Sequence, residues 1–358
     1  MRCLIRPATA EDDPAIRALL RATFQPGMVP LNFEREPSYF HGSAVACGEQ
    51  DVWIACDRDS QHEALALFNM GSREVYVNGT PVRLRYAHDL RLAPEVRGSR
   101  LLIQLFRQAR QQIYPGEWLH TVILSDNTVS LQTVGSGRAG MPHYYPHGEI
   151  GTHMLFAPPR RRAGHRITRA TEGDLPQMRE WLREQGPRRH FFPVYRLDSL
   201  LSGDPYYRGL QLSDFFLAWR GQQLVGMAGT WNQKPFKQTR VLAYPMGLSW
   251  LRHAYNLHSR VRGGLTLPPA GGTLDYLLLH TMLIENDDPA ILDALLQQIL
   301  AEQRGAVSVG MFSDDPLADA VQGYRRQTLR SQHFLISYED NPAAELDCRL
   351  PYVEIARL

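Results

Sequence analysis

The residues with the clearest chemical character lie between positions 86 and 112, in the run YAHDLRLAPEVRGSRLLIQLFRQARQQ. Arg97 and Arg100 place positive charge on either side of Gly98, just before a stretch with helical spacing. The first amides of a helix have no partner within it, and the helix dipole favours an anion there. The turn therefore suits a phosphate or pyrophosphate. The alternative is an ordinary turn with solvated arginines.

A strand and a helix must hold this turn. Leu84, Tyr86, His88, Leu90 and Leu92 fall on alternate positions, which is the period of a half-buried strand. The apolar residues between 101 and 109 recur at three- and four-residue spacing, which predicts a helix with one apolar face. The pattern is therefore strand, basic turn, helix.

Titratable residues in and after this strand could move protons. Neighbours in a regular strand point to opposite faces, so we expect either His88 or Asp89 to enter the cleft and accept a proton, directly or through water. A buried histidine satisfied by hydrogen bonds is the alternative. His143 and His147 are further candidates in a predicted loop, 142–148.

The run from Leu90 to Gly98, LRLAPEVRG, resembles the signature of the GCN5-related N-acetyltransferases (GNAT). The resemblance implies that the turn amides hold the pyrophosphate of acetyl-CoA and that the preceding strand binds its pantetheine arm. Arg100 and Leu102 stand where that family carries two small residues, and Arg100 could contact phosphate directly. The cofactor-binding residues implied are Leu90, Leu92, Val96, Arg97, Gly98, Ser99, Arg100, Leu101, Leu102 and Asn127.

The same resemblance implies catalytic roles. A backbone amide of the central strand, near Leu92, would stabilise the oxyanion, and a tyrosine would protonate the leaving thiolate. Tyr144 and Tyr145 lie in the corresponding region, although the gap from Asn127 is longer than in the family. The alternative is a tyrosine-rich loop that packs on the core. The catalytic candidates are thus Tyr144, Tyr145, His88 and Asp89.

The chain repeats a phrase. IRPATAEDDPAIRALLR begins at Ile5 and ITRATEGDLPQMREWLR begins at Ile167, a constant offset of 167 minus 5, or 162 residues. Thr9 and Thr171 stand before each predicted helix as possible caps. A tandem repeat of one domain follows.

We therefore predict an α+β fold of tandem acetyltransferase-like domains, each with a mixed, mostly antiparallel sheet flanked by helices. The predicted boundaries are 1–158, a linker at 159–166, and 167–358. The linker's Arg160, Arg161 and Arg162 are either solvated surface or a phosphate contact. The asparagine-glycine pair at 78–79 predicts a hairpin, and strands are expected at 332–338 and 352–355.

The second copy has an acidic turn where the first has a basic one. Glu285, Asp287 and Asp288 precede Pro289, and carboxylates there would repel a pyrophosphate. Helix capping explains them instead. The second domain is thus expected to lack a cofactor site. An inserted segment, 247–272, carries a predicted helix, and the aromatic residues Trp231, Tyr244, Trp250, His253 and Tyr255 could wall a substrate pocket.

The bulk composition narrows the classes of function. The 358 residues have a net charge of +2, which disfavours nucleic acid as a partner. The four cysteines show no metal-ligand spacing, so no metal is expected, and no run reaches membrane-spanning length. We expect a cytoplasmic monomer or homodimer without a membrane partner.

The leading hypothesis is an N-acetyltransferase that moves an acetyl or short acyl group from acyl-CoA to a small-molecule or peptide amine, by direct attack in a ternary complex. No cysteine has a recognisable nucleophile context. Two alternatives stay open: a non-catalytic acyl-CoA-binding or interaction protein, and an aminoacyl-tRNA-dependent transferase.

Overall fold

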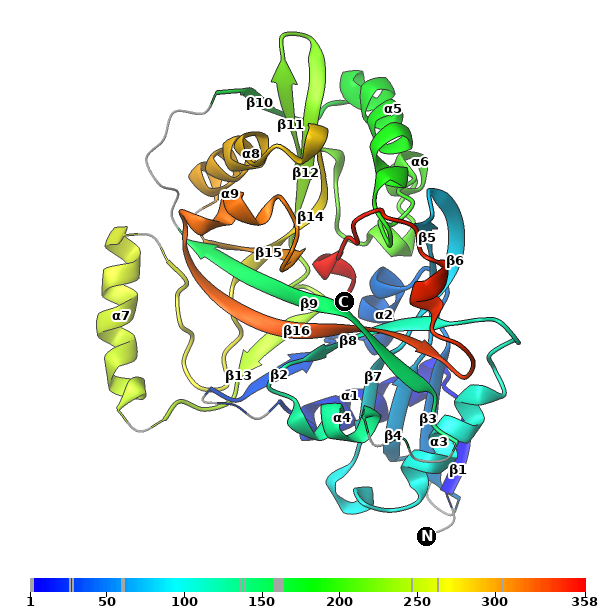
Figure 1. Ribbon diagram of the computed structural model, residues 1–358. Helices are drawn as coiled ribbons and strands as arrows, with labels where there is room; N and C mark the ends of the chain where they lie inside the picture. The colour runs from blue at the N-terminus through cyan, green and yellow to red at the C-terminus, as the bar shows by residue number, and fades with distance from the viewer. Residues whose placement is uncertain are drawn as a thin grey trace.

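A computed structural model shows two halves joined through one long sheet (Figure 1). It describes the whole chain except residues 1–2, 26, 28, 59–61, 136, 138–139, 157–163, 246, 263 and 304. The predicted linker arginines, Arg160 to Arg162, therefore lie outside the described residues.

The first half is built from strands and helices that include two elements not predicted from the sequence, β2 and α2. Its strands are β1 (Cys3–Pro7), β2 (Leu31–Glu34), β3 (Val52–Asp57), β4 (Ala64–Asn69), β5 (Ser72–Val77), β6 (Thr80–Tyr86), β7 (His88–Leu92), β8 (Leu119–Leu124) and β9 (His143–Phe156). Its helices are α1 (Asp13–Ala22), α2 (Tyr39–Ala46), α3 (Leu101–Arg110) and α4 (Thr128–Val134).

The second half repeats this plan. Its strands are β10 (Arg166–Arg169), β11 (Phe215–Arg220), β12 (Gln223–Trp231), β13 (Gln238–Val241), β14 (Tyr276–Ile284), β15 (Ala306–Phe312) and β16 (Arg325–Ser337). Its helices are α5 (Leu175–Gln185), α6 (Leu197–Leu201), α7 (Leu248–Arg262), α8 (Pro289–Glu302) and α9 (Ala318–Gln322).

Local sequence explains the matching starts of the two halves. The amide of Thr9 donates to Asp12 Oδ2 at 2.7 Å, and the amide of Thr171 donates to Asp174 Oδ2 at 2.8 Å. In each case the aspartate carboxylate accepts a hydrogen bond from the threonine amide, which lies ahead of the helix, and the threonine stands at the capping position. The tandem repeat predicted from the phrase is confirmed. The predicted hairpin is also present, with Asn78 and Gly79 both at positive φ.

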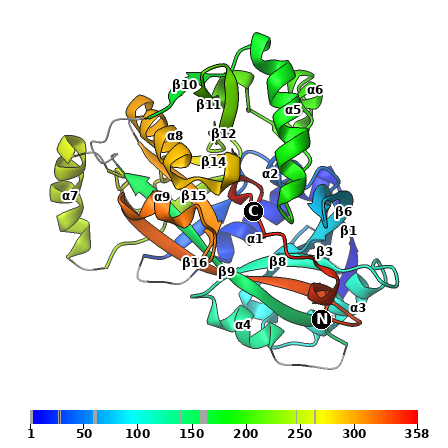
Figure 2. The same cartoon turned by 45° about the horizontal axis from the view of Figure 1, so that its top comes forward.

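The halves exchange strands. The long sheet has the order β10-β11-β12-β14-β15-β9-β16-β8-β6-β5, so β9 of the first half pairs with β15, and β16 of the second half pairs with β8. Figures 1 and 2 show β9 and β16 running side by side through the middle of the molecule. A second sheet, β1-β3-β4-β7, belongs to the first half alone, and β2 pairs with β13 across the halves. The boundaries 1–158 and 167–358 stay a prediction.

Two expectations about strands were wrong. The 142–148 segment is not a loop, since β9 begins at His143 and pairs with β16 on both sides of a register shift near His147. The 352–355 segment is not a strand; it leads into a short helical turn, Ile355–Arg357, and is buried between the halves. Pairing across the sequence, which local pattern does not specify, decided both.

Candidate functional site

The predicted strand divides at Ala87, where the two sheets of the first half part. Tyr86 is paired in parallel with His120 of β8, and Ala87 accepts a hydrogen bond of 2.7 Å from Thr121 Oγ1. Beyond this point β7 pairs with β4 while β8 pairs with β16. The two strands splay, and one edge of β7 has no strand neighbour in the described part of the chain.

A β-bulge lies on the splayed strand at Asp89. The pairing of β7 with β4 shifts register there, and Asp89 has a φ of 52°, which few residues other than glycine adopt. The bulge turns the carboxylate back, so that Asp89 Oδ2 lies 3.1 Å from His88 Nδ1. The expectation that these neighbours face opposite ways was therefore wrong, because it assumed a regular strand.

Asp89 is buried among groups that favour its charge. Its side chain is 9% exposed; Arg35 Nη2 lies 3.4 Å and the Tyr39 hydroxyl 3.2 Å from Oδ2. Burial alone would raise the pKa of this carboxyl, but Arg35 and the His88 hydrogen bond outweigh it and hold the pKa well below its ordinary value. Asp89 is thus a buried carboxylate that orients an imidazole.

His88 is held on three sides. Its ring stacks on Tyr86 with a centroid distance of 4.9 Å, and Cys47 Sγ lies 3.9 Å from its Nε2. Burial lowers the His88 pKa against the opposing effect of Asp89. With Nδ1–H donating to the ionised Asp89, the neutral ring presents Nε2 as a proton acceptor.

Cys47, Arg35 and Tyr39 were missed at the level of sequence. They come from α2 and the residues that flank it, about 50 residues upstream of the bulge, and no local spacing links them to it. Cys47 is fully buried, and burial raises the pKa of its thiol to about 12. A protonated, enclosed thiol is a poor nucleophile.

The basic turn is exposed and open. Gly98 has a φ of 76°, and a methyl group there would meet no atom within 4 Å. Arg97 and Arg100 are both exposed, and neither forms an ion pair with any described residue. Within the same part of the chain, the amides of Gly98, Arg100, Leu102 and Ile103 have no hydrogen-bond acceptor. These free donors and charges suit the pyrophosphate of a CoA thioester.

The other predicted cofactor residues have mixed positions. Leu90 is 39% exposed on the splayed strand, whereas Leu92 pairs regularly with Ala66, so the irregular backbone lies at Asp89 and not at Leu92. Val96 and Leu101 are buried in the hydrophobic core of the first half, and Ser99 Oγ accepts from the Leu101 amide. The Asn127 side chain caps α4 by accepting from the Ser130 amide at 3.1 Å.

Tyr144 and Tyr145 are consecutive residues of β9, and their side chains pack in different places. Tyr144 packs against the first core and against Phe334, and burial raises its pKa. The Tyr145 hydroxyl donates to the Glu339 carbonyl at 2.9 Å. His147 lies on the same strand, partly buried near His333. None of these side chains bonds to His88 or Asp89, so their catalytic roles stay predictions.

The second half carries the same bulge, but different residues contact it. Thr281 has a φ of 52° and follows His280, and the pairing of β14 with β12 shifts register there. Here Glu354 Oε2 accepts from the Thr281 amide at 2.8 Å, and the Tyr352 hydroxyl accepts from the Met282 amide at 3.1 Å. Residues 352–354 thus supply acceptors to the strand amides of the second bulge, whereas no described side chain does so for the Asp89 and Leu90 amides of the first.

The acidic turn of the second half has a structural explanation, as expected. Asp288 Oδ1 accepts from the Ala290 amide at 2.9 Å and caps α8, with proline at the helix start. Glu285 pairs with Arg220 at 2.7 Å, and Asp287 pairs with Arg189 at 2.6 Å. The neighbouring arginines are therefore engaged, and the turn offers no free cation among the described residues.

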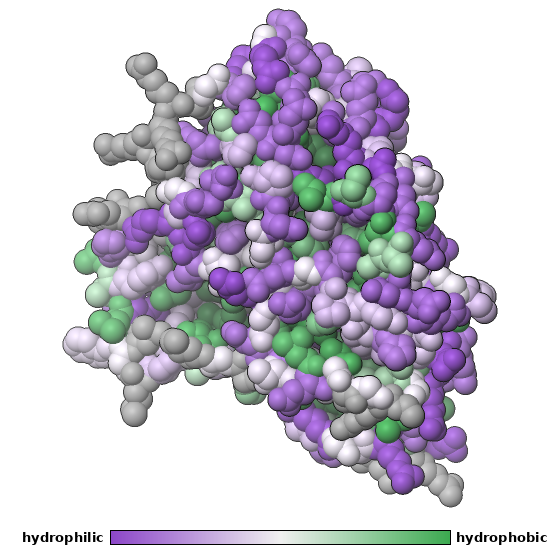
Figure 3. Space-filling model, in the orientation of Figure 1, coloured by the Kyte–Doolittle hydropathy of each residue, from purple (hydrophilic) through white to green (hydrophobic). Residues whose placement is uncertain are grey.

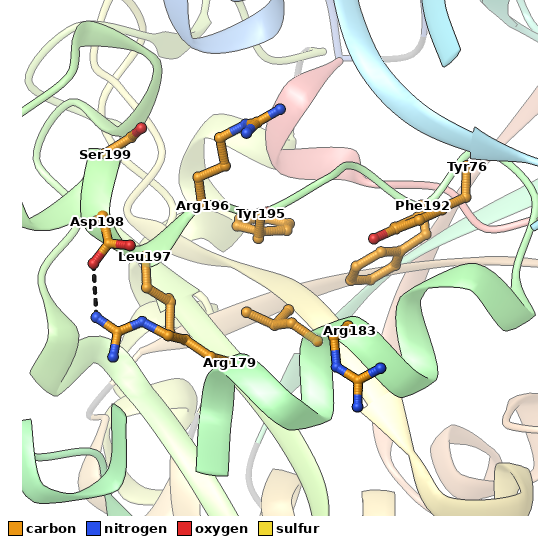
Figure 4. Close-up of a pocket in the computed structure, with 10 residues that line it drawn as sticks. Tyr76, Arg179, Arg183, Phe192, Tyr195, Arg196, Leu197, Asp198 and Ser199 are labelled. Carbon is orange, nitrogen blue, oxygen red and sulfur yellow. Dashed lines mark hydrogen bonds and ion pairs between the residues drawn. The ribbon is translucent and has the colours of Figure 1, made fainter. Parts of the chain in front are cut away.

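A cleft of 440 Å³ lies elsewhere, between α5 and the segment 192–199 (Figure 4). Arg179 points to Asp198, at 2.6 Å, and Arg196 pairs with Glu74. None of the residues predicted for the site lines this cleft, so it does not mark the bulge. The predicted aromatic wall is also not assembled, because Trp231 is buried in the core while Trp250 is 89% exposed on α7.

No group of three histidine, cysteine or acidic side chains in the described residues could hold a metal ion. None of the helices described is both long and apolar enough to cross a bilayer. All four cysteines are free thiols.

Solved structures resemble this chain over nearly its whole length. A GCN5-related N-acetyltransferase from Anabaena variabilis aligns with a TM-score of 0.54 and 11% identity, covering 94% of this chain and 73% of its own. N-myristoyltransferase of Saccharomyces cerevisiae with bound myristoyl-CoA aligns with a TM-score of 0.58 and 11% identity, covering 96% and 80%.

No protein-family model and no curated protein matches the sequence. The likeness therefore rests on the fold. N-myristoyltransferase is itself built from tandem GNAT folds. This chain has the tandem GNAT fold, an α+β architecture with a large mixed sheet shared by two acetyltransferase-like halves.

Proposed function

We propose that this protein is a CoA-dependent N-acyltransferase that moves an acetyl or short acyl group to an amine, with the acyl-CoA bound in the first half. One observation carries the proposal: two matching bulges lie on splayed strands, and only the first adjoins a basic turn with free amides. At the second bulge, Glu354 and Tyr352 already bond to the amides of the strand.

The residues of the first turn fit the pyrophosphate of acyl-CoA. Gly98 leaves open space in front of the turn, the amides of Arg100 and Leu102 begin α3, and Arg97 adds charge. Leu90, on the free edge of β7, would lie along the pantetheine arm. When bound, acyl-CoA would supply an activated thioester carbonyl.

His88 would serve as the proton acceptor for the attacking amine. Burial lowers its pKa, so the ring is neutral near pH 7, and Asp89 holds the tautomer in which Nε2 is unprotonated and faces the Cys47 thiol at 3.9 Å. After transfer, the imidazolium would be stabilised by the adjacent Asp89 carboxylate. Such a base contributes roughly 10²- to 10⁴-fold to a rate.

Thermal stabilisation by acetyl-CoA tests the cofactor site. A ligand that binds only the folded state contributes roughly 2.7 kcal/mol at about 100 times its dissociation constant. Arg97→Glu with Arg100→Glu should abolish the shift while leaving the apo melting temperature nearly unchanged. The matched control is Arg107→Glu with Arg325→Glu, since both are exposed arginines outside the turn. Equal loss in the two variants would refute a local phosphate site.

Release of CoA thiol in the presence of a panel of amines separates catalysis from binding. Binding without release for any amine would favour the non-catalytic alternative. Cys47→Ala should retain turnover, because its thiol is buried with a raised pKa and direct attack does not need it. Loss of turnover in this variant, with binding intact, would point to a covalent acyl-enzyme.

A further inference from the structure

Helix α7 is turned the opposite way from an ordinary surface helix. Trp250 is 89% exposed, Leu251 61% and Leu257 66%, and Ala254 is exposed between them. Trp250, Ala254 and Leu257 follow a spacing of four and three residues, so they share one face of the helix. This stripe faces solvent, although a stripe of this kind normally covers a core.

The opposite side of α7 holds the helix to the protein through polar groups. Asn256 both donates to the Leu267 carbonyl and accepts from the Leu267 amide, each at 2.9 Å, and Arg252 donates to the same carbonyl at 3.3 Å. Ser259 on this side is 5% exposed. The polar side of α7 therefore contacts the rest of the protein, and the apolar stripe has no partner among the described residues.

The helix stands at the edge of the molecule. Figures 1 and 2 both show α7 apart from the sheet, and in Figure 3 hydrophobic residues lie at the left border where Figure 1 has α7. The segment has no counterpart among the described elements of the first half. With 15 residues it is about 22 Å long, enough to lie along a flat surface.

The charge of α7 indicates what kind of surface it meets. Its sequence, LSWLRHAYNLHSRVR, contains three arginines and two histidines and no acidic residue. A second copy of this chain would bring the same cationic helix against it, so self-association through this face is disfavoured. An anionic surface is complementary to it.

We infer that α7 lies on the surface of a membrane that contains anionic lipids. Tryptophan and leucine on the exposed stripe would enter the boundary between headgroups and acyl chains, and the net positive charge of the helix would favour the anionic headgroups. The sequence led us to expect no membrane partner because it has no membrane-spanning run. A helix that lies in the interface needs none.

Co-sedimentation with vesicles tests this inference. The full chain should bind vesicles made of equal parts phosphatidylserine and phosphatidylcholine more than about tenfold more tightly than vesicles of phosphatidylcholine alone, and raised salt should weaken the binding. Trp250→Ala with Leu257→Ala should remove binding. The melting temperature of this double variant and its thermal stabilisation by acetyl-CoA should not change, because both side chains are exposed.

The matched control is Tyr114→Ala with Val129→Ala, a pair that is 75% and 72% exposed in the first half. It should bind vesicles like the unaltered chain. Failure to bind either vesicle, or equal loss in both variants, would overturn the inference. So would binding to polyglutamate without vesicle binding, or a dimer in sedimentation velocity that only the α7 variant dissociates.

A spectroscopic measurement avoids dependence on a double variant. Brominated acyl chains in the anionic vesicles should quench part of the tryptophan emission, and Trp250→Phe should remove that quenching. Quenching that persists in Trp250→Phe would place another tryptophan at the membrane and would refute the assignment to α7.

Discussion

Asp89 and Thr281 occupy the same place in the two halves. Each follows a histidine, each has a φ of 52°, and each interrupts an antiparallel pairing, that of β7 with β4 or that of β14 with β12. The partner of the histidine differs: His88 Nδ1 lies 3.1 Å from a carboxylate oxygen, while His280 Nδ1 lies 2.7 Å from a hydroxyl. The backbone irregularity is shared, and the chemistry around it is not.

The surroundings of the two bulges differ just as much. The second bulge is closed by Glu354, which is 2% exposed and also accepts from the Tyr195 and Tyr352 hydroxyls at 3.1 Å. In the described part of the first half, no side chain accepts from the amides of Asp89 or Leu90. A repeated fold can thus keep its strained backbone while its own chain fills one copy of the cleft.

Replacing each histidine by glutamine should give the largest contrast. His88→Gln should lower kcat roughly 10²-fold or more, because it removes the proposed proton acceptor, whereas His280→Gln should retain kcat within about twofold. Steady-state rates of CoA release measure both. Equal losses in the two variants would mean that the bulges do not differ in function.

Removing the side chain that closes the second cleft should cost stability rather than activity. Glu354→Ala should lower the free energy of unfolding by about 3 kcal/mol, because it leaves three buried donors, the Thr281 amide and the Tyr195 and Tyr352 hydroxyls, without their acceptor. Urea unfolding measures the loss. Calorimetry of the same variant should still give one equivalent of acetyl-CoA; two equivalents would mean that Glu354 alone keeps the second half from binding.

Lowering the pH should reduce the stability of the folded chain through both His88 and His280. Burial lowers the pKa of both, and that of His280 falls well below its ordinary value. Below about pH 6.5 the unfolded chain binds these protons and the folded chain does not, so stability falls as the pH falls, by up to about 1.4 kcal/mol per pH unit for each histidine. His280→Gln should flatten this slope more than His88→Gln, because Asp89 opposes the shift at His88. Urea midpoints at pH 6.5 and 5.5 test it.

Much of the fold was accessible from local pattern. The repeated phrase beginning at Ile5 and Ile167 and the Asn78-Gly79 hairpin act over short distances, and the structure confirms both. The alternating strand into Pro94 is present as two strands, β6 and β7, because the chain changes sheets at Ala87 and bulges at Asp89. The basic and acidic turns could also be predicted from the sequence, because charged residues at a helix start interact with the helix dipole. The α7 helix was expected, but its inverted orientation was not.

The sequence by itself determined a duplicated α+β chain in which one helix start is cationic and its counterpart acidic, since capping, periodicity and charge are properties of neighbouring residues. Only the tertiary structure decided that Asp89 turns back onto His88, that Cys47 and Arg35 join them, and that Glu354 closes the second cleft. Those contacts depend on a bulge and on an exchange of strands between the halves. Both arise from pairing between segments far apart in the chain, which no local spacing encodes.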